Sequence, residues 1–374
     1  MILDVQSSLQ IHHTSHHHVL YPRFPLRRRS AALFLILGTV LLLLVGGTTA
    51  YTDVRAGADP TVMKVGNNYY SAESADGGIW VRESPTLEGL GKPAQRKKVW
   101  SNNMDAVWAP EISTEGGRTW IHFAAGNDHR MYAISADSPL GNYPSDATKV
   151  SLPDDRWAID GVLFTFGGQR YLVWSGWEGT DNVEQNLYIA RMSSPTQATG
   201  ARYIISQPRE PWESKKDGGN PLINEGPEAI VDPDGQLHIV YSANGSWGPR
   251  YCLADLRLKK GGDPTNVWDW YKSNGCLFGS EQGNMMAGWD ATLGIDGPGH
   301  HTFALPNGDV GASPGGTDHI PFMFHGVAKG TPYSWDNRHW YTGSFVWWAQ
   351  TKYSRKDVPG DTENVGYSFK FFEA

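Results

Sequence analysis

One arrangement of turns and strands recurs five times along this chain of 374 residues. Each copy has a polar residue, a short alternating run, a tight glycine-bearing turn and a second, aromatic-rich run, which is the pattern of a β-hairpin. The copies cover residues 58–72, 109–125, 159–175 and 224–244, with a less regular fifth that begins at 299–309 and resumes at 320–326 after a glycine-rich insertion. Self-similarity at such a period is typical of folds that repeat one supersecondary unit.

A third predicted strand follows each hairpin. In the first three copies it ends in Ser-Pro, at Pro85, Pro139 and Pro195, which lie 54 and 56 residues apart. Proline cannot extend a hydrogen-bonded ladder, so these prolines mark strand ends. Residues 251–258 and 345–353 take the matching places in the last two copies.

Five units of three or four antiparallel strands, without a sustained helical period, predict an all-β fold. We expect a five-bladed β-propeller with antiparallel blades around a central channel. A jelly roll or β-sandwich would account for the strands but not for the repeated order of elements.

Composition narrows the class of partner. The formal net charge is -7 and the pI is near 6.0, so the chain lacks the basic field that nucleic-acid binding needs. No Rossmann or P-loop glycine fingerprint is present, nor a His/Cys set at zinc spacing after the first fifty residues. A neutral or weakly charged small partner such as a sugar fits better.

Residues 1–53 differ from the rest and are predicted to be a leader, with the propeller spanning 54–374. Three arginines, Arg27 to Arg29, precede an apolar run over 31–45, the layout of a signal peptide or a short membrane anchor. Because the positive charge lies on the N-terminal side, either reading places the bulk of the chain outside the cytoplasm. We expect a secreted protein, with a single-pass anchored one as the alternative. The histidines at 12–18 are interpreted as a biased tail.

Export makes the two cysteines, Cys252 and Cys276, candidates for a disulfide, with two buried free thiols as the alternative. The sequon that begins at Asn244 follows a predicted strand, where a surface loop is expected.

Polar residues lead the five hairpins, and in a propeller the starts of the innermost strands point toward one end of the axis. These residues are Asp59, Glu111, Asp160, Glu225 and His300. Clustered carboxylates raise at least one pKa, so that one group can hold a proton while another stays charged. Glycoside hydrolysis requires that combination of acid and base. For each residue alone, a turn-forming acid is the competing interpretation.

Five motifs in the same order resemble the glycoside hydrolases of family 43, which are five-bladed propellers acting on arabinose- and xylose-containing polysaccharides. They are ADP at 58–60, VWAPEI at 107–112, AIDG at 158–161, NEGPE at 224–228 and GPGHHTF at 297–303. The resemblance implies that Asp59 is the general base and Glu225 the general acid. It implies that Asp160 raises the pKa of the general acid and orients it. It also implies inversion of the anomeric centre.

Other roles follow from the same resemblance. His300 would lie at the channel centre, where relatives hold a calcium or another ion, often through water, and Trp108 would form an apolar wall against the sugar. A basic residue late in the chain would help to hold the sugar, with Arg338 as the candidate and His325 as a second. Trp177, in a loop just past its strand, is a further candidate for sugar contact.

Within the family, the stretches 89–100, 123–134 and 206–213 look most like exo-α-1,5-L-arabinofuranosidases. The expected activity is release of terminal α-L-arabinofuranosyl residues from arabinan or arabino-oligosaccharides by a monomer that needs no cofactor for the chemistry. β-Xylosidase activity and a non-catalytic carbohydrate-binding propeller are the alternatives, and exo or endo action stays open.

Three further side chains carry expectations that the structure can test. Trp174 is expected in the core. Glu111 is expected one residue out of register, as a structural acid. Glu228 shows no recurrence in the repeats and is expected to be a structural or solvent-facing acid.

Overall fold

The computed structural model describes residues 51–101, 104–215, 221–313, 318–355 and 362–372. The chain divides into two units, Met1–Gly47 and Thr48–Ala374, and the description that follows concerns the second. Most of the predicted leader lies outside the described residues. Its last residues do not, because Tyr51 is buried in the core and the strand β1 (Thr52–Ala56) follows it. The predicted boundary at residue 54 therefore falls within a folded strand.

The described strands form five consecutive groups that are antiparallel within themselves. Group one holds β2 (Met63–Val65), β3 (Asn68–Ala75), β4 (Gly78–Ser84) and β5 (Gln95–Ser101); group two β6 (Trp108–Glu115), β7 (Arg118–Ala125), β8 (Arg130–Ala136) and β9 (Thr148–Lys149); group three β10 (Ala158–Phe166), β11 (Gln169–Gly176), β12 (Glu184–Ser194) and β13 (Gln197–Ser206); group four β14 (Leu222–Val231), β15 (Leu237–Ala243), β16 (Cys252–Leu258) and β17 (Trp270–Lys272); group five β18 (Ile295–Phe303), β19 (Ile320–Ala328), β20 (His339–Arg355) and β21 (Thr362–Phe372).

The predicted all-β class is confirmed. Helical turns in the described ranges are short 3-10 segments, namely η1 (Glu88–Gly91), η2 (Val267–Asp269), η3 (Gln282–Asn284), η4 (Val310–Ala312) and η5 (Trp335–Asn337). None of the described helices is long and apolar enough to cross a membrane. The strand exits predicted at Pro85 and Pro195 directly follow the ends of β4 and β12.

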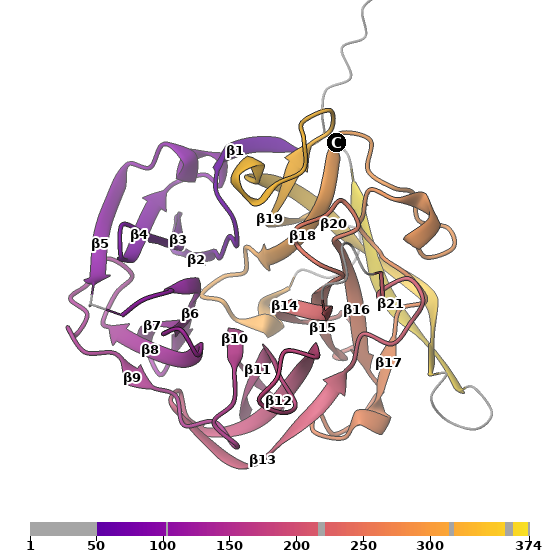
Figure 1. Ribbon diagram of the computed structural model, residues 1–374, viewed down its shortest axis with the longest axis horizontal. Coiled ribbons are helices and arrows are strands. Elements are labelled where there is room, and N and C mark those ends of the chain that lie inside the picture. The colour runs from indigo at the N-terminus through magenta and orange to yellow at the C-terminus, as the bar shows by residue number, and fades with distance from the viewer. Residues whose placement is uncertain (1–50, 102–103, 216–220, 314–317, 356–361, 373–374) are drawn as a thin grey trace, which may run out of the picture. The chain divides into compact units, whose positions relative to one another are not determined.

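The hydrogen-bonded ladders do not themselves close into a ring. Groups one and two are separate four-stranded sheets, whereas groups three to five join into one 13-stranded sheet. The joins are short, a parallel contact of β12 with β14 and one pair between β17 and β20. Figure 1 shows the five groups following one another around the middle of the view, with the first strands of the groups nearest the middle.

A hydrophobic cluster lies between each pair of consecutive groups. Met63 and Ile79 of group one pack with Ile112 and Phe123 of group two. The other four clusters join groups two and three, three and four, four and five, and five and one. Trp174 lies in the cluster between groups two and three and is 1% exposed, as expected for a core residue. Burial of apolar surface between neighbouring sheets therefore stabilises the contact of group five with group one as it does the others.

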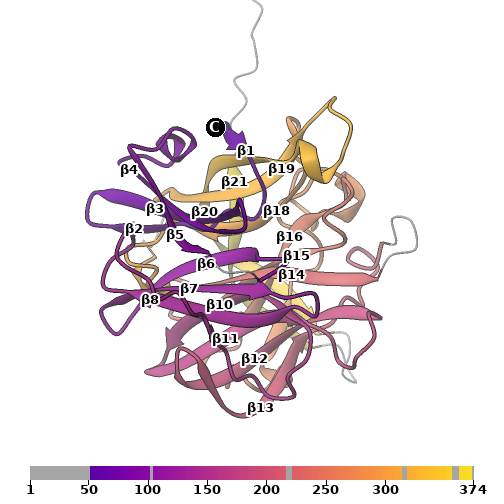
Figure 2. The same ribbon diagram turned by 60° about the vertical axis from the view of Figure 1, so that its left-hand side comes forward.

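The N-terminal strand completes the last group. Thr52 of β1 is paired with Thr342 of β20, and Ala56 with His339. Figure 2 shows β1 beside β20 at one edge of the unit. The two ends of the folded unit are thus held in one sheet, far apart in sequence but adjacent in space.

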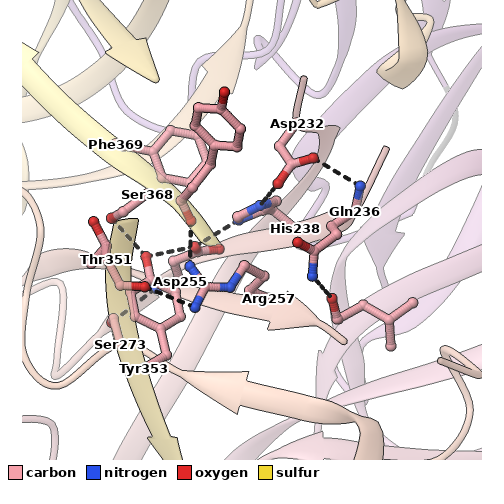
Figure 3. A network of polar contacts seen from close by, with 12 residues as sticks. Asp232, Gln236, His238, Asp255, Arg257, Ser273, Thr351, Tyr353, Ser368 and Phe369 are labelled. Carbon is pink, nitrogen blue, oxygen red and sulfur yellow. Dashed lines mark hydrogen bonds and ion pairs between the residues drawn. The ribbon is translucent and has the colours of Figure 1, made fainter. Parts of the chain in front are cut away.

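A buried polar network fastens group four to the hairpin of β20 and β21 (Figure 3). The fully buried His238 places Nε2 3.3 Å from Asp232 and Nδ1 2.7 Å from Asp255. Tyr353 of β20 donates to the same Asp255 carboxylate at 2.8 Å. Arg257 donates to the side chain of Asn364 and to the carbonyl of Tyr367 at 2.8 and 2.6 Å. Buried polar groups are tolerated because they are paired.

Two local predictions can be judged directly. Cys252 and Cys276 are joined by a disulfide, so the free-thiol alternative is wrong. The sequon at Asn244 is not a surface site, because Asn244 is 1% exposed and its amide donates to the carbonyls of Trp212 and Arg250. A side chain committed to buried hydrogen bonds cannot carry a glycan in the folded protein.

Candidate active site

Left-handed residues recur where the first strands of the groups begin. Asp59, Ala109, Asp160 and His300 have φ of 50°, 40°, 56° and 40°, and Gly226 has φ of 53°. The pairing register of β6, β10, β14 and β18 shifts at the same places, which marks β-bulges. A bulge re-aims side chains, and strained backbone of this kind gathers at functional sites. The bulges therefore explain how strands in different groups present polar side chains together.

Asp59 lies among basic and imidazole groups. Its Oδ1 is 3.2 Å from His300 Nδ1 and 3.9 Å from Arg338 Nη1, and its backbone N–H donates to His325 Nδ1 at 3.0 Å. Burial opposes ionisation of Asp59, but the charges of His300 and Arg338 help to outweigh it, so the pKa lies well below its usual range. The side chain keeps 31% exposure, so this carboxylate is charged and open to water.

His325 is not a basic residue in this setting. It is fully buried, which lowers its pKa to about 4 despite the carboxylate of Asp59. Because Nδ1 accepts the Asp59 N–H, that nitrogen carries no proton. Of the two late basic candidates, Arg338 supplies a positive charge beside Asp59, and His325 supplies a neutral acceptor that fixes its backbone.

His300 is held between two carboxylates. Its Nε2 is 3.4 Å from Glu111 Oε1, on the opposite side of the ring from Asp59, and its backbone N–H donates to Ser242 Oγ at 2.7 Å. Burial disfavours the charged ring, but Asp59, Asp160 and Glu111 raise its pKa to about 10. A positive imidazolium therefore lies at the centre of the acidic cluster.

Asp160 and Glu225 are linked through the backbone. The buried carboxylate of Asp160 accepts the N–H of Gly226, the residue after Glu225, at 2.9 Å. A side chain at Gly226 would meet the His300 ring at about 3.2 Å, and its left-handed φ also favours glycine. Burial and then the charge of Asp160 raise the pKa of Glu225 to about 8. Burial also raises the pKa of Asp160, against the effect of His300.

Tyr251 completes this cluster, and sequence reasoning did not identify it. The tyrosine is fully buried, and burial, Glu225, Asp59 and Asp160 keep its pKa well above the usual range. Its ring stacks on His325 with centroids 5.5 Å apart. It fits against β18 because residue 299 is glycine, where a Cβ would come within 2.1 Å of the ring. No turn or repeat signal marks Tyr251, since it precedes β16 rather than leading a hairpin.

Glu111 and Glu228 share a position that was not expected. Counted from the left-handed residue of its strand, each lies two residues further on, so Glu111 is two residues out of phase rather than one. Both line one cavity, together with Val162 and Thr302. Burial raises the pKa of both, and the charge of Glu111 adds to the effect on Glu228. Glu228 thus recurs with Glu111 and is not a solvent-facing acid.

The two predicted tryptophans belong to one row of rings. Trp108, 44% exposed, packs on His129 at 4.2 Å between centroids, and His129 lies 5.7 Å from Trp157. Trp157 stacks on Trp177 at 4.8 Å and 9°. The row carries the open ring of Trp108 at one end, while Trp157 covers one face of Trp177.

The family model described as Glycosyl hydrolases family 43 matches residues 54–348. The chain belongs to this family.

Two named relatives are each 28% identical to this chain over the aligned residues. An "Extracellular exo-alpha-(1->5)-L-arabinofuranosidase" of Streptomyces avermitilis is 28% identical over 75% of this chain and 61% of its own length. A protein of the same name from Streptomyces chartreusis is 28% identical over 67% of this chain and 76% of its own. The match thus spans less than two thirds of the first relative.

A solved structure agrees with the sequence comparison. The alpha-L-arabinofuranosidase from Lactobacillus brevis superposes with a TM-score of 0.65 at 25% identity, over 79% of this chain and 92% of that one. This likeness shows that the described unit shares its fold with that alpha-L-arabinofuranosidase.

A cation bound directly by His300 does not fit this donor set. Both ring nitrogens already face carboxylates. Nowhere in the described ranges do three or more histidine, cysteine or acidic side chains form a cluster suited to a metal ion. The predicted metal role of His300 is therefore not supported as direct ligation, and we derive no step through an ion.

Proposed function

We propose that this family 43 chain is a glycoside hydrolase that removes terminal α-L-arabinofuranosyl residues from arabinan or arabino-oligosaccharides by an inverting mechanism. One observation carries the chemistry: Glu225 has its pKa raised to about 8, while the Asp59 carboxylate in the same cluster is kept ionised by His300. Neighbouring carboxyls whose pKa values are pushed apart are suited to act as acid and base.

The proposed roles follow from these protonation states. Glu225 holds a proton at neutral pH and donates it to the glycosidic oxygen as the bond breaks. Asp59, charged and in reach of water, removes a proton from the water that attacks the anomeric carbon. Asp160 acts through Glu225, because its charge raises the pKa of that acid and its carboxylate fixes the Gly226 backbone.

Substrate contacts are proposed for the open ring of Trp108, for Trp177 and for Arg338. His300 is proposed to place its positive charge between the acids rather than to bind a metal. Since every residue named here comes from one chain, we propose that the monomer is active.

We further propose that the five strand groups are the blades of a five-bladed β-propeller. Hydrophobic clusters join every consecutive pair of groups, including the fifth with the first. Hydrogen bonds also link successive strand starts, from Val62 N–H to Thr302 Oγ1 and from Ile112 N–H to Thr61 Oγ1. Radial packing of blades does not need hydrogen bonds between neighbouring sheets.

The arabinose assignment is supported by the names of the two Streptomyces relatives and of the Lactobacillus brevis structure. Those names also support an extracellular location, as does the disulfide between Cys252 and Cys276. We propose that residues 1–53 contain the export signal, or a membrane anchor that leaves the hydrolase outside.

Hydrolysis of aryl α-L-arabinofuranoside and aryl β-D-xyloside tests the proposal. We expect turnover of the arabinofuranoside, and release of arabinose as the first product from linear arabinan. Preferential turnover of the xyloside would replace the proposal with β-xylosidase activity. Hydrolysis of neither glycoside, nor of oligosaccharides, would favour a binding-only propeller.

A further inference from the structure

The connection between β19 and β20, residues 329–338, is fixed against the start of the first strand group. Gly57 N–H donates to the carbonyl of Arg338 at 3.0 Å, and the indole N–H of Trp340 donates to the carbonyl of Ala58 at 2.9 Å. Asn337 closes the connection on itself by donating to the carbonyl of Pro332 at 2.9 Å. The segment is therefore held beside residues 57–59, which end at Asp59.

The other side of this connection is fixed against β18. The hydroxyl of Tyr333 donates to the carbonyl of Gly297 at 3.4 Å. The two approach closely because residue 297 is glycine, where a Cβ would lie about 2.5 Å from the tyrosine hydroxyl. The turn η5, which carries Trp335, is thus supported from both ends.

Arg338 contacts both Trp335 and Asp59. Its Nη1 is 3.9 Å from Asp59 Oδ1, and its Cζ is 5.6 Å from the centroid of the Trp335 ring. Its Nε donates to the Trp335 carbonyl at 3.2 Å. Since the arginine side chain is only 13% exposed while Trp335 is 52% exposed, the arginine is the inner member of the pair.

An indole that is half exposed beside a polar site needs an explanation, because large apolar rings usually bury most of their surface. A sugar ring offers C–H faces that pack on an aromatic face and hydroxyls that suit a neighbouring arginine. The Arg338 cation orders the Trp335 ring from one side by a cation–π contact and leaves the remaining surface open.

We propose that Trp335 is a substrate-binding residue that contacts the sugar released by the enzyme. This inference rests on the proposed function, in which Asp59 activates water on the side of the anomeric carbon opposite to the leaving group. Groups on the Asp59 side therefore face the released sugar, and groups beyond Glu225 face the rest of the chain. Trp335 contacts Arg338, which lies next to Asp59, so Trp335 belongs to the Asp59 side of the site.

The chain offers a matched control in Trp268. This tryptophan is also 52% exposed, also lies in a 3-10 turn, η2, and also has an arginine over its ring, Arg355 at 4.6 Å. It lies on the connection from β16 to β17, whereas Trp335 lies on the connection that reaches Asp59. Trp335→Ala and Trp268→Ala therefore remove similar rings from different surroundings.

The test compares both variants on an aryl α-L-arabinofuranoside and on arabinotriose. We expect Trp335→Ala to lower kcat/KM by about tenfold, the loss typical of truncating a contacting tryptophan, and by the same factor on both substrates. Trp335→Phe should recover most of the rate, and Trp268→Ala should match the wild type.

Two results would overturn the inference. Equal activity of the two alanine variants would show that Trp335 makes no contact, and a loss confined to arabinotriose would place it against the leaving portion instead. If the wild type hydrolyses the xyloside and not the arabinofuranoside, the proposed activity is wrong while the same comparison on the xyloside still tests Trp335. Should Trp335→Ala fail to fold by circular dichroism, Trp335→Leu takes its place in the comparison.

Discussion

Replacing Glu225 by glutamine gives the most informative test of the proposed mechanism, because the environment of this residue sets its effect. With a pKa of about 8, Glu225 is about nine-tenths protonated at pH 7, whereas an ordinary glutamic acid at 4.5 would be about 0.3% protonated. The site therefore raises the fraction of competent acid by about 300-fold. Glutamine keeps the shape but has no proton to give.

The expected loss depends on the leaving group. General acid catalysis contributes about 10²–10⁴-fold, so Glu225→Gln should lose that factor on arabino-oligosaccharides, whose alkoxide leaves poorly. On a dinitrophenyl arabinofuranoside, which needs little protonation, the loss should be much smaller. The wild-type kcat/KM should also fall above pH about 8, where Glu225 loses its proton, and the variant should lack that fall.

Glu228→Gln serves as the matched control from the same strand. The pKa of Glu228 is raised well above its usual value, so a neutral amide replaces a group that is already neutral. We expect its rate to stay within a few-fold of the wild type. Equal losses for Glu225→Gln on the good and the poor leaving group, or an unchanged fall at high pH, would refute the acid assignment.

Three other substitutions probe the fold around the site. Gly299→Ala places a Cβ 2.1 Å from the Tyr251 ring and should destabilise the fold by about 1–3 kcal/mol, with loss of activity. Gly179→Ala is the control, because a Cβ there meets nothing within 4 Å, and it should change neither stability nor activity. Thermal melting of both variants measures the difference in stability. Replacing Cys252 and Cys276 by serine opens a loop of 24 residues and should lower the free energy of unfolding by about 3 kcal/mol in urea titrations. His238→Gln removes the imidazole that both buried carboxylates, Asp232 and Asp255, contact and should cost about 3–5 kcal/mol. The folded-state pKa of His238 is raised, so its contribution is complete below about pH 6.5 and is lost only at higher pH, as the pH rises through the folded-state pKa. The lowered pKa of Asp232 adds stability above about pH 4. A gap in melting temperature that did not shrink toward alkaline pH would contradict this.

Much of the fold could be predicted from the sequence because its signals are local. Each hairpin carries its own turn residues, and the prolines end their strands whatever the neighbouring group does. The joining of the groups could not be predicted in this way. The single pair between Lys272 and Ser354 links β17 to β20, and neither segment carries a sequence signal for it. The disulfide was equally open, because two cysteines reveal their partners only once β16 and residue 276 lie side by side.

The site was predictable where one residue type recurs and was missed where a contact is made between groups. Asp59, Asp160 and His300 share the left-handed position at the start of their strands, so the repeat identified them. Tyr251 and Trp335 come from connections with no counterpart in the other groups. Gly299 leaves room for the Tyr251 ring, and Gly297 leaves room for Tyr333 on the connection that carries Trp335, and only the folded structure relates these glycines to the connections.

The backbone at the strand starts explains why Glu111 lies two residues out of phase with Asp160. Sequence alone aligned Glu111 with Asp160, but the left-handed residue of β6 is Ala109, two residues earlier. A bulge adds a residue without changing the hairpin's turn signals, so phase counted from the turn and phase counted from the bulge differ. Aligned on the bulge, Glu111 falls with Glu228 and Thr302, which line the same cavity, whereas Asp59 and Asp160 are themselves the left-handed residues. Glu111 contacts the groups of the proposed chemistry through His300, at 3.4 Å. We therefore propose that Glu111 acts on the reaction by keeping His300 charged, and that Glu225 is the glutamate that acts directly on the substrate.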